Sequence, residues 1–346
     1  MSVALPHPGA SSPIHAARVR VSASTTNLGG GFDCLGMGVD RWLTATVAAS
    51  GGDARDGALP AVGIARAGTL AALDAGASPP PPPHEDLLYV GFAAACAARG
   101  RPLPARLDFT ATSEIPVARG LGSSAAAVVA GAALADAALA LALGPEELAA
   151  LCAEVEHHPD NVAAAVFGGA VLAVRPAGGA RAAAGYLFAP LAPHPSLAFA
   201  FAVPDFEVST AAARRALPAT LPHPVAVAAA GKGAALMQGL ATGRPELLAA
   251  ALDDVLHVPY RRAMIRGYDS VTAAAREAGA IGATLSGSGP TLVAVAVGEA
   301  AARAAGAAMC DAWRAQGVRA EPIVAAGAPA GGLRVEAVEA PPPPVA

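Results

Sequence analysis

The chain has 346 residues and a formal net charge of −4, and 54% of its residues are hydrophobic but only 4% aromatic. Alanine, a strong helix former, supplies most of this hydrophobic fraction. The most apolar stretch, residues 125–143, is interrupted by glycine and aspartate and falls short of the ~20 apolar residues that a membrane span needs, so we expect no membrane partner. Without a run of basic residues we expect no nucleic-acid partner either.

The length predicts two lobes with a site between them, because single cores tend to divide in chains of this size. We expect a disordered tail at 1–17, an N-terminal lobe at 18–190, a C-terminal lobe at 191–326 and a second tail at 327–346. The N-terminus lacks the basic start and apolar region of a secretion signal. The four cysteines are widely spaced, without a zinc pattern, and suit a reducing compartment. We therefore predict a cytoplasmic protein.

The first half of the chain alternates strand and helix patterns. A proline run at 79–83 predicts a loop before the first helix, and a glycine marks the end of the second helix. The expected strands lie at 18–22, 42–48, 107–112 and 168–174, and the expected helices at 84–99, from 124 to 144, and at 145–157.

The second half resembles a split β-α-β unit. Apolar runs predict its strands, and alanine-rich stretches predict its helices. The expected strands lie at 197–203, near 283, at 291–297 and at 318–324, and the expected helices between 225 and 257 and at 299–316.

Residues 120–124, Gly-Leu-Gly-Ser-Ser, are the most informative part of the chain. Glycines let a backbone approach a bulky anion, and a helix N-terminus offers unpaired N–H groups and a positive dipole end. A triphosphate is therefore the natural ligand, although the same residues could simply cap an ordinary helix. The chain has neither the Gly-x-x-x-x-Gly-Lys-Ser/Thr nor the Gly-x-Gly-x-x-Gly pattern, which disfavours a P-loop NTPase and a dinucleotide-binding protein.

A second polar cluster, at residues 154–161, ends the helix that follows this loop. Mg²⁺ prefers hard oxygen ligands and commonly uses one or two protein groups plus substrate phosphates, so Ser124 and Glu156 would suffice to hold it. The alternative is a solvated helix end, where histidines favour the negative end of the helix dipole.

Two glycine-flexed loops complete the candidate site. One carries Asn27 and Asp33, which suit the ammonium and hydroxyl groups of a small polar ligand. The other, residues 286–290, forms a tight turn between two apolar runs, which either touches a ligand or only joins two strands.

These four segments, in this order and spacing, resemble the GHMP kinases, the family that includes galactokinase, homoserine kinase, mevalonate kinase and phosphomevalonate kinase. The resemblance covers residues 18–325, with the central motif at 116–126 and the C-terminal glycine-rich motif at 282–291. It implies an α+β fold of two lobes, an ATP-binding N-terminal lobe like ribosomal protein S5 domain 2 and a ferredoxin-like C-terminal lobe. It also implies ATP and Mg²⁺ as cofactors and usually a homodimer.

Within the family, residues 24–36 and 158–161 resemble the homoserine kinases. This implies transfer of the γ-phosphoryl group of ATP to the side-chain hydroxyl of L-homoserine, a step of threonine biosynthesis. One alternative is a GHMP kinase for another small alcohol, such as mevalonate or a sugar. Another is a non-catalytic ligand-binding protein on the same fold, which the presence of Glu156 and the loop serines disfavours.

The resemblance also implies which residues form the site. Asp33 would meet the substrate ammonium group, and two arginines its carboxylate, because a guanidinium meets a carboxylate bidentately. The implied ATP-binding residues are Asp86, Pro116, Arg119, Gly120, Leu121, Gly122, Ser123, Ser124, Ala125 and Ala126, with Ser124 and Glu156 as metal ligands. The implied substrate-binding residues are Asn27, Asp33, His158, Asn161, Arg214, Arg261, Ser286 and Gly287.

The sequence shows no strong general base. Mevalonate kinase relatives use an aspartate with a lysine, but here the matching lysine is absent and Asn161 stands on the substrate side. Phosphoryl transfer can proceed largely by positioning and charge stabilisation, so direct attack by the hydroxyl is plausible, with Thr210 as a proton relay. Asp160 is the competing base. Two positions depart from the family pattern: Asp86 replaces a common asparagine near the adenine, and His157 replaces a common glycine.

Overall fold

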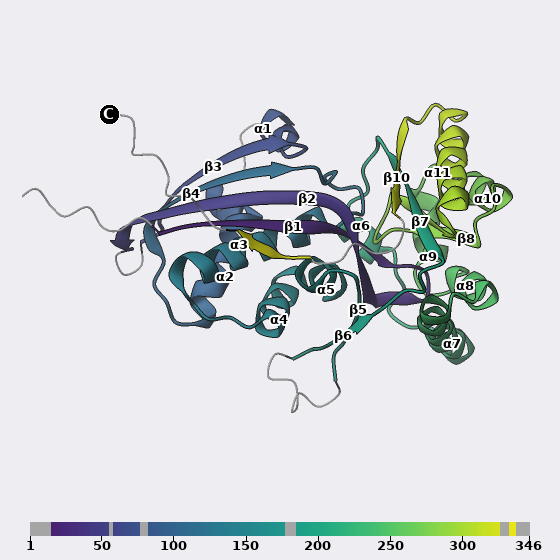
Figure 1. Ribbon diagram of the computed structural model, residues 1–346, viewed down its shortest axis with the longest axis horizontal. Helices are drawn as coiled ribbons and strands as arrows, with labels where there is room; N and C mark the ends of the chain where they lie inside the picture. Colours follow the sequence, from purple (N-terminus) through teal and green to yellow (C-terminus); the bar gives the residue numbers. More distant parts are fainter. Residues whose placement is uncertain (1–14, 55–57, 77–81, 177–184, 326–331, 337–346) are drawn as a thin grey trace, which may run out of the picture.

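The computed structural model describes residues 15–54, 58–76, 82–176, 185–325 and 332–336. Two β-sheets, each covered by helices, form the two lobes of the α+β fold that the sequence predicts (Figure 1). No helix within these described ranges is long and apolar enough to cross a membrane.

The first sheet combines segments from both ends of the chain. Its main path runs β11-β1-β2-β4-β3, with β5 and β6 attached to β2, and β3 and β4 are its parallel pair. The sequence did not predict β3 and β6, and neither strand has a buried residue that would give an apolar pattern. The strands are β1 (His15–Asn27), β2 (Gly31–Asp53), β3 (Ala61–Gly68), β4 (Pro104–Ser113), β5 (Ala170–Val174), β6 (Leu187–Leu191) and β11 (Arg334–Glu336).

The helices of the first lobe cover one face of this sheet. α3 (Ser123–Leu139) and α5 (Asp160–Phe167) pack on β1 and β2, while α2 (Leu87–Ala98) and α4 (Pro145–Glu156) flank α3 (Figure 1). The short elements α1 (Ala71–Gly76) and η1 (Pro83–Glu85) precede α2.

The predicted end of the second helix at Gly144 is wrong, because α3 ends five residues earlier. Ala140 and Ala142 adopt left-handed backbone conformations, with φ of 52° and 57°. The side chain of Asp136 accepts a hydrogen bond from Leu143 N at 2.9 Å, which secures the turn that follows the helix.

The second lobe has the strand order of a ferredoxin-like fold. Its antiparallel sheet runs β10-β7-β9-β8, with several helices between its first two strands in chain order and α11 between its last two. The strands are β7 (Leu197–Pro204), β8 (Gly282–Leu285), β9 (Leu292–Val297) and β10 (Ala320–Ala325). The helices are α6 (Thr210–Arg215), α7 (His223–Thr242), α8 (Pro245–Leu252), α9 (Val258–Arg261), η2 (Arg262–Met264), α10 (Tyr268–Glu277) and α11 (Glu299–Arg314).

Strand β7 faces two hydrophobic cores because successive side chains of a strand point to opposite faces. Phe199 and Phe201 belong to the core that continues into the first lobe. Ala198 and Ala200 belong to the core beneath α10 and α11, which also holds the buried Trp313. The continuous first core packs the two lobes against each other.

Two strands lie partly or wholly inside segments that the sequence predicts as tails. β1 begins at His15, inside the predicted N-terminal tail, and β11 lies inside the predicted C-terminal tail. β11 pairs with β1, where Arg18 Nε lies 2.7 Å from Glu336 Oε2. This end of the chain therefore completes the first lobe. Residues 1–14, 337–346 and part of the proline run lie outside the described residues, and the predicted lobe boundary at 190 falls at the end of β6.

Candidate active site

A cavity of about 340 Å³ lies between the lobes and has one apolar and one polar end. The start of α3 also lines it. Side chains at the apolar end are Leu43, Leu70, Leu73, Leu87, Leu88 and Val117. Side chains at the polar end are Asn27, Asp33, His158, Asp160, Asn161, Thr210, Arg214, Arg261 and Ser288.

Two glycines allow the loop at 120–124 to approach its neighbours closely. Both have left-handed backbones, with φ of 76° at Gly120 and 69° at Gly122. A Cβ atom at Gly122 would lie 2.0 Å from Ser24 Oγ, and one at Gly120 would lie 2.4 Å from Ser286 O. No side chain caps α3, so the N–H groups of its first turn have no side-chain partner. This helix start favours an anionic ligand.

Not every residue predicted to bind ATP lines the cavity. The exceptions are Pro116, Ala125 and Ala126. The two alanines are fully buried in the core, so their side chains support the loop from behind. Arg119 lines the cavity, but its guanidinium donates to Pro204 O at 3.0 Å and Asp205 O at 3.1 Å. Arg119 thus ties the loop to the second lobe.

The unusual Asp86 has a charged partner at the apolar end. Its Oδ1 accepts from Leu88 N at 2.8 Å and caps α2, while its Oδ2 lies 2.5 Å from Arg66 Nη2. Arg66 also contacts Asp74. Burial opposes the charge of Arg66, but its hydrogen bonds and ion pairs with the two aspartates prevail and raise its pKa. The carboxylate that replaces the family's asparagine is therefore neutralised by Arg66.

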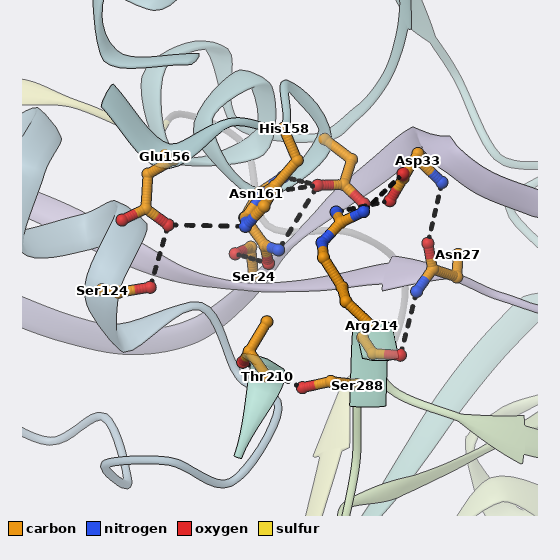
Figure 2. A network of polar contacts seen from close by, with 12 residues as sticks. Ser24, Asn27, Asp33, Ser124, Glu156, His158, Asn161, Thr210, Arg214 and Ser288 are labelled. Atoms are coloured by element: carbon orange, nitrogen blue, oxygen red, sulfur yellow. Dashed lines mark hydrogen bonds and ion pairs between the residues drawn. The ribbon is translucent and has the colours of Figure 1, made fainter. Parts of the chain in front are cut away.

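Ser124 and Glu156 meet beside the phosphate loop, where Ser124 Oγ donates to Glu156 Oε2 at 2.9 Å (Figure 2). Burial raises the pKa of Glu156, against His158 and the Ser124 hydrogen bond, which lower it. Such a buried carboxylate is stabilised by a nearby cation. Two hard oxygen donors suit Mg²⁺. Within the described residues no group of three or more His, Cys, Asp or Glu could hold a metal, so a cation here would share its coordination with phosphate oxygens.

His158 lies between two acids. Its Nδ1 is 3.3 Å from Asp160 Oδ1 and its Nε2 is 3.7 Å from Glu156 Oε2, and both contacts become ion pairs when the imidazole is protonated. Burial lowers the pKa of His158, but the two acids outweigh it and the net shift is upward. Asp160 also accepts from Asn161 N at 2.7 Å. Because Asp160 is already paired in this way, it is poorly placed to act as a free general base.

Asp33 and Arg214 form a bidentate ion pair across the cavity, with Nη1–Oδ2 and Nη2–Oδ1 distances of 3.0 and 2.9 Å (Figure 2). Asn27 holds the Asp33 loop: its Oδ1 accepts from Asp33 N at 3.0 Å, and its Nδ2 donates to Gly287 O at 2.9 Å. The two groups expected to bind the opposite charges of one ligand therefore face each other. An amino-acid zwitterion carries the same two charges and could pair with both.

Arg261 is a buried cation, with an exposed fraction of 2%. It donates to Ala213 O at 3.2 Å and Gly287 O at 3.3 Å, and its guanidinium lies 5.1 Å from the ring centre of Phe32. Among the described residues no carboxylate lies within ion-pair distance of it. Burial lowers its pKa, and the charge of Arg214 adds to that effect. A buried guanidinium without an acidic partner favours an anionic ligand group.

The predicted catalytic side chains come from both lobes. Asn161 Oδ1 accepts from Ser24 Oγ at 2.8 Å. Thr210 Oγ1 lies 3.2 Å from Ser288 Oγ, and Figure 2 shows this pair on the side of the site opposite Asn161. Both hydroxyls and the amide line the cavity.

Ser286, predicted to bind the substrate, does not line the cavity. It is fully buried, and its hydroxyl lies 2.7 Å from Gly120 O and 2.8 Å from Thr25 Oγ1. Ser286 therefore lets the turn at 286–290 support the phosphate loop. Two other residues of this turn, Gly287 and Ser288, line the cavity.

Several lining residues escaped the sequence prediction. Arg66 and the leucines around it come from segments without a recognisable motif. Thr26 could have been found, because it lies within the motif at 24–36. Its hydroxyl is buried and has no hydrogen-bond partner in the described part of the chain, and Thr26 lines the cavity, so the hydroxyl is available to a ligand.

Comparison with known proteins agrees with this geometry. The profile of the GHMP kinases N terminal domain matches residues 88–169, and that of the GHMP kinases C terminal domain matches residues 236–315. The homoserine kinase of Picosynechococcus sp. is 38% identical over 302 residues, 87% of this chain and 93% of the relative. That of Synechococcus sp. is 40% identical over 307 residues, 88% of this chain and 94% of the relative. The crystal structure of homoserine kinase from Cytophaga hutchinsonii has a TM-score of 0.78 at 26% identity and covers 97% of this chain and 100% of that chain.

An anion-binding helix start between two lobes, with a polar pocket beside it, is the arrangement of an ATP-dependent small-molecule kinase. The chain belongs to the GHMP kinase family and, within it, to the homoserine kinases.

Proposed function

We propose that the protein transfers the γ-phosphoryl group of ATP to the side-chain hydroxyl of L-homoserine, giving ADP and O-phospho-L-homoserine. The observation that carries this proposal is the charge pattern of the polar end: Asp33 suits an ammonium group, and the unpaired Arg261 suits a carboxylate. Mevalonate and galactose lack the ammonium group, so neither would pair with Asp33. The homoserine kinase relatives support the same substrate.

ATP would lie along the cavity with its adenine among the leucines of the apolar end and its phosphates at residues 120–124. Ser124 and Glu156 would hold Mg²⁺, which would neutralise charge on the phosphate oxygens. The support for this metal site is the buried Glu156 carboxylate, whose raised pKa reflects an unfavourable charge that a cation would stabilise.

The chemistry would proceed mainly by positioning. Asn161 and Thr210 reach the cavity from opposite lobes and would orient the attacking hydroxyl, with Thr210 passing its proton onward. A strong base is not required for a loose transition state. The close contact of Asp160 with His158 supports this view over a mechanism in which Asp160 accepts the proton.

We also propose that the protein works in the cytoplasm, as its sequence suggests, and that it forms a homodimer, as the family resemblance implies. The four cysteines are free thiols, which suits a reducing compartment. Size-exclusion chromatography with light scattering tests the dimer: a mass near twice the 33.7 kDa of one chain supports it, and a monomer at micromolar concentration contradicts it.

An ADP-release assay with MgATP tests the proposed function. L-homoserine, L-serine, L-threonine, mevalonate and galactose would be offered in parallel. Turnover confined to L-homoserine is the expected result. Preference for mevalonate or galactose would overturn the substrate, and ATP binding without turnover of any alcohol would favour the non-catalytic alternative.

A further inference from the structure

We propose that His257 is a positioning residue that fixes Arg261 for the substrate carboxylate while leaving its positive charge free. The inference rests on the proposed function, because it requires a substrate with a carboxylate. His257 lies directly before α9, does not line the cavity and is fully buried. It would therefore act through Arg261 and not by touching the substrate.

The contacts of the imidazole define which nitrogen carries the proton. Nε2 lies 3.3 Å from Gly29 O, and Nδ1 lies 3.4 Å from Arg261 Nη1. A carbonyl oxygen can only accept a hydrogen bond, and a guanidinium can only donate one. The ring must therefore donate through Nε2 and accept through Nδ1, which is the arrangement of a neutral imidazole.

The surroundings keep the ring neutral and in place. Burial lowers the pKa of His257 to about 4; Asp254 and Asp33 act in the opposite direction, and Arg261 adds to the lowering. Asp254 Oδ2 is 3.7 Å from Nε2, but it already accepts from the backbone N–H groups of His257 and Val258 at 2.7 Å each. Phe32 stacks on the imidazole at 5.0 Å between ring centres.

A neutral acceptor and an acidic one would have different effects on Arg261. A carboxylate at position 257 would orient the guanidinium but also neutralise it, as Asp33 does for Arg214. The groups that accept hydrogen bonds from Arg261 are neutral: two carbonyl oxygens and the imidazole. Arg261 thus keeps a fixed direction and an uncompensated charge, and both favour binding of a carboxylate.

Two variants and two substrates test the proposal. His257→Leu removes both hydrogen bonds, whereas His257→Asn keeps an acceptor near the position of Nδ1. For L-homoserine we expect KM to rise about 10- to 100-fold in His257→Leu, the range for a lost hydrogen bond to a charged group, and to recover largely in His257→Asn. The KM for ATP should change less than about twofold, since the phosphate loop is untouched.

The second substrate is 3-aminopropan-1-ol, which is homoserine without its carboxylate, used as substrate or as competitive inhibitor. Its apparent affinity should be the same in wild type and His257→Leu, because it offers nothing to Arg261. Equal losses for both ligands, or no recovery in His257→Asn, would overturn the proposal. Melting curves of the variants establish that each is folded.

Nitrogen NMR of the histidine imidazoles in the wild-type protein gives a test that does not depend on the folding of a variant. The His257 resonance is assigned as the one that disappears in His257→Asn. A neutral ring protonated on Nε2 at pH 7 is expected. A charged ring, or one protonated on Nδ1, would contradict the proposal. Failure of the wild type to phosphorylate L-homoserine would instead contradict the proposed function, while the NMR result would still decide the orientation of the imidazole.

Discussion

Charged side chains around the cavity differ in whether the protein itself neutralises them. Asp86 is neutralised by Arg66, and Asp33 by Arg214, whereas Arg261 has no acidic partner among the described residues. Among the described residues, the Glu156 carboxylate contacts only the distant His158 and the Ser124 hydroxyl. The incompletely neutralised charges are those that we expect a substrate carboxylate and a metal cation to meet.

Glu156→Gln should lower kcat by about 100-fold or more and weaken the dependence of the rate on Mg²⁺, because the amide loses the charge that a hard cation requires. Glu154→Gln is a matched control two residues away, since Glu154 is exposed and pairs only with the exposed Arg175 among the described residues. Measuring the rate of both variants as a function of Mg²⁺ concentration tests this prediction. Wild-type magnesium dependence in Glu156→Gln would remove Glu156 from the metal site.

Arg66 and Asp86 should behave as one unit in nucleotide binding. Arg66→Ala leaves the Asp86 carboxylate unpaired beside an anionic nucleotide, so we expect the Kd for ATP to rise roughly tenfold. The double variant Arg66→Ala/Asp86→Asn removes the more buried of the two carboxylates that Arg66 pairs with, leaving only the largely exposed Asp74, and should bind ATP nearly as well as wild type. Calorimetric titration with ATP measures both effects without relying on turnover. If the double variant binds ATP more weakly than Arg66→Ala does, Arg66 and Asp86 are not coupled in this way.

At the scale of elements, the start of α3 depends on Gly122, whose backbone lies close to the Ser24 side chain of β1. Gly122→Ala would push a Cβ atom to 2.0 Å from Ser24 Oγ and 3.0 Å from Asn161 Oδ1, which would displace the phosphate loop. We expect at least about a 100-fold loss of kcat/KM, since small misplacements of reacting groups are costly.

Gly100→Ala is the control for backbone strain. Its φ of 59° is also left-handed, but nothing lies within 4 Å of the added Cβ atom. It should lose stability to a similar degree and keep its activity. Equal losses of kcat/KM in the two variants would contradict the argument from close approach.

Elements with a strong sequence signal were predicted, and those held mainly by tertiary contacts were not. The proline and paired glutamates at the start of α4 mark it clearly, and its predicted bounds agree with the structure to one residue. β3 and β6 lie at the sides of the sheet without a buried residue, so no apolar alternation reveals them. In the site, the sequence motifs predicted the phosphate loop and the position of Asp33 in the chain. The Asp33–Arg214 pair joins residues 181 positions apart, and no sequence spacing could predict it.

At the scale of the whole molecule, the chain closes the first lobe with its own C-terminal segment. β11 pairs with β1, and Leu333 N donates to Val166 O of α5 at 3.2 Å. A variant ending at Ala325 should melt several degrees lower than one ending at Glu336, since about 1 kcal/mol corresponds to roughly 2–4 °C for a protein of comparable size. Thermal melts of the two variants give the comparison. Equal melting temperatures would show that β11 adds nothing to the first lobe.

The two lobes also meet around the site. Ser286 of the second lobe contacts the phosphate loop, and Arg119 beside that loop donates to the end of β7 at Pro204 and to Asp205 directly after it. The ligand pocket is therefore built from both lobes, with groups suited to phosphate mainly on the first lobe and the arginines suited to a carboxylate on the second. Transfer requires both ligands in one cavity at once.

The most direct test of the account is the identity of the reaction product. Phosphorus NMR of a mixture of the protein, MgATP and L-homoserine should show one new phosphomonoester signal that grows in step with ADP and coincides with O-phospho-L-homoserine. The Asp33→Asn variant should produce this signal much more slowly, because it loses the charge that meets the ammonium group. Release of inorganic phosphate alone, or a phosphomonoester that forms equally well in Asp33→Asn, would contradict the central claim.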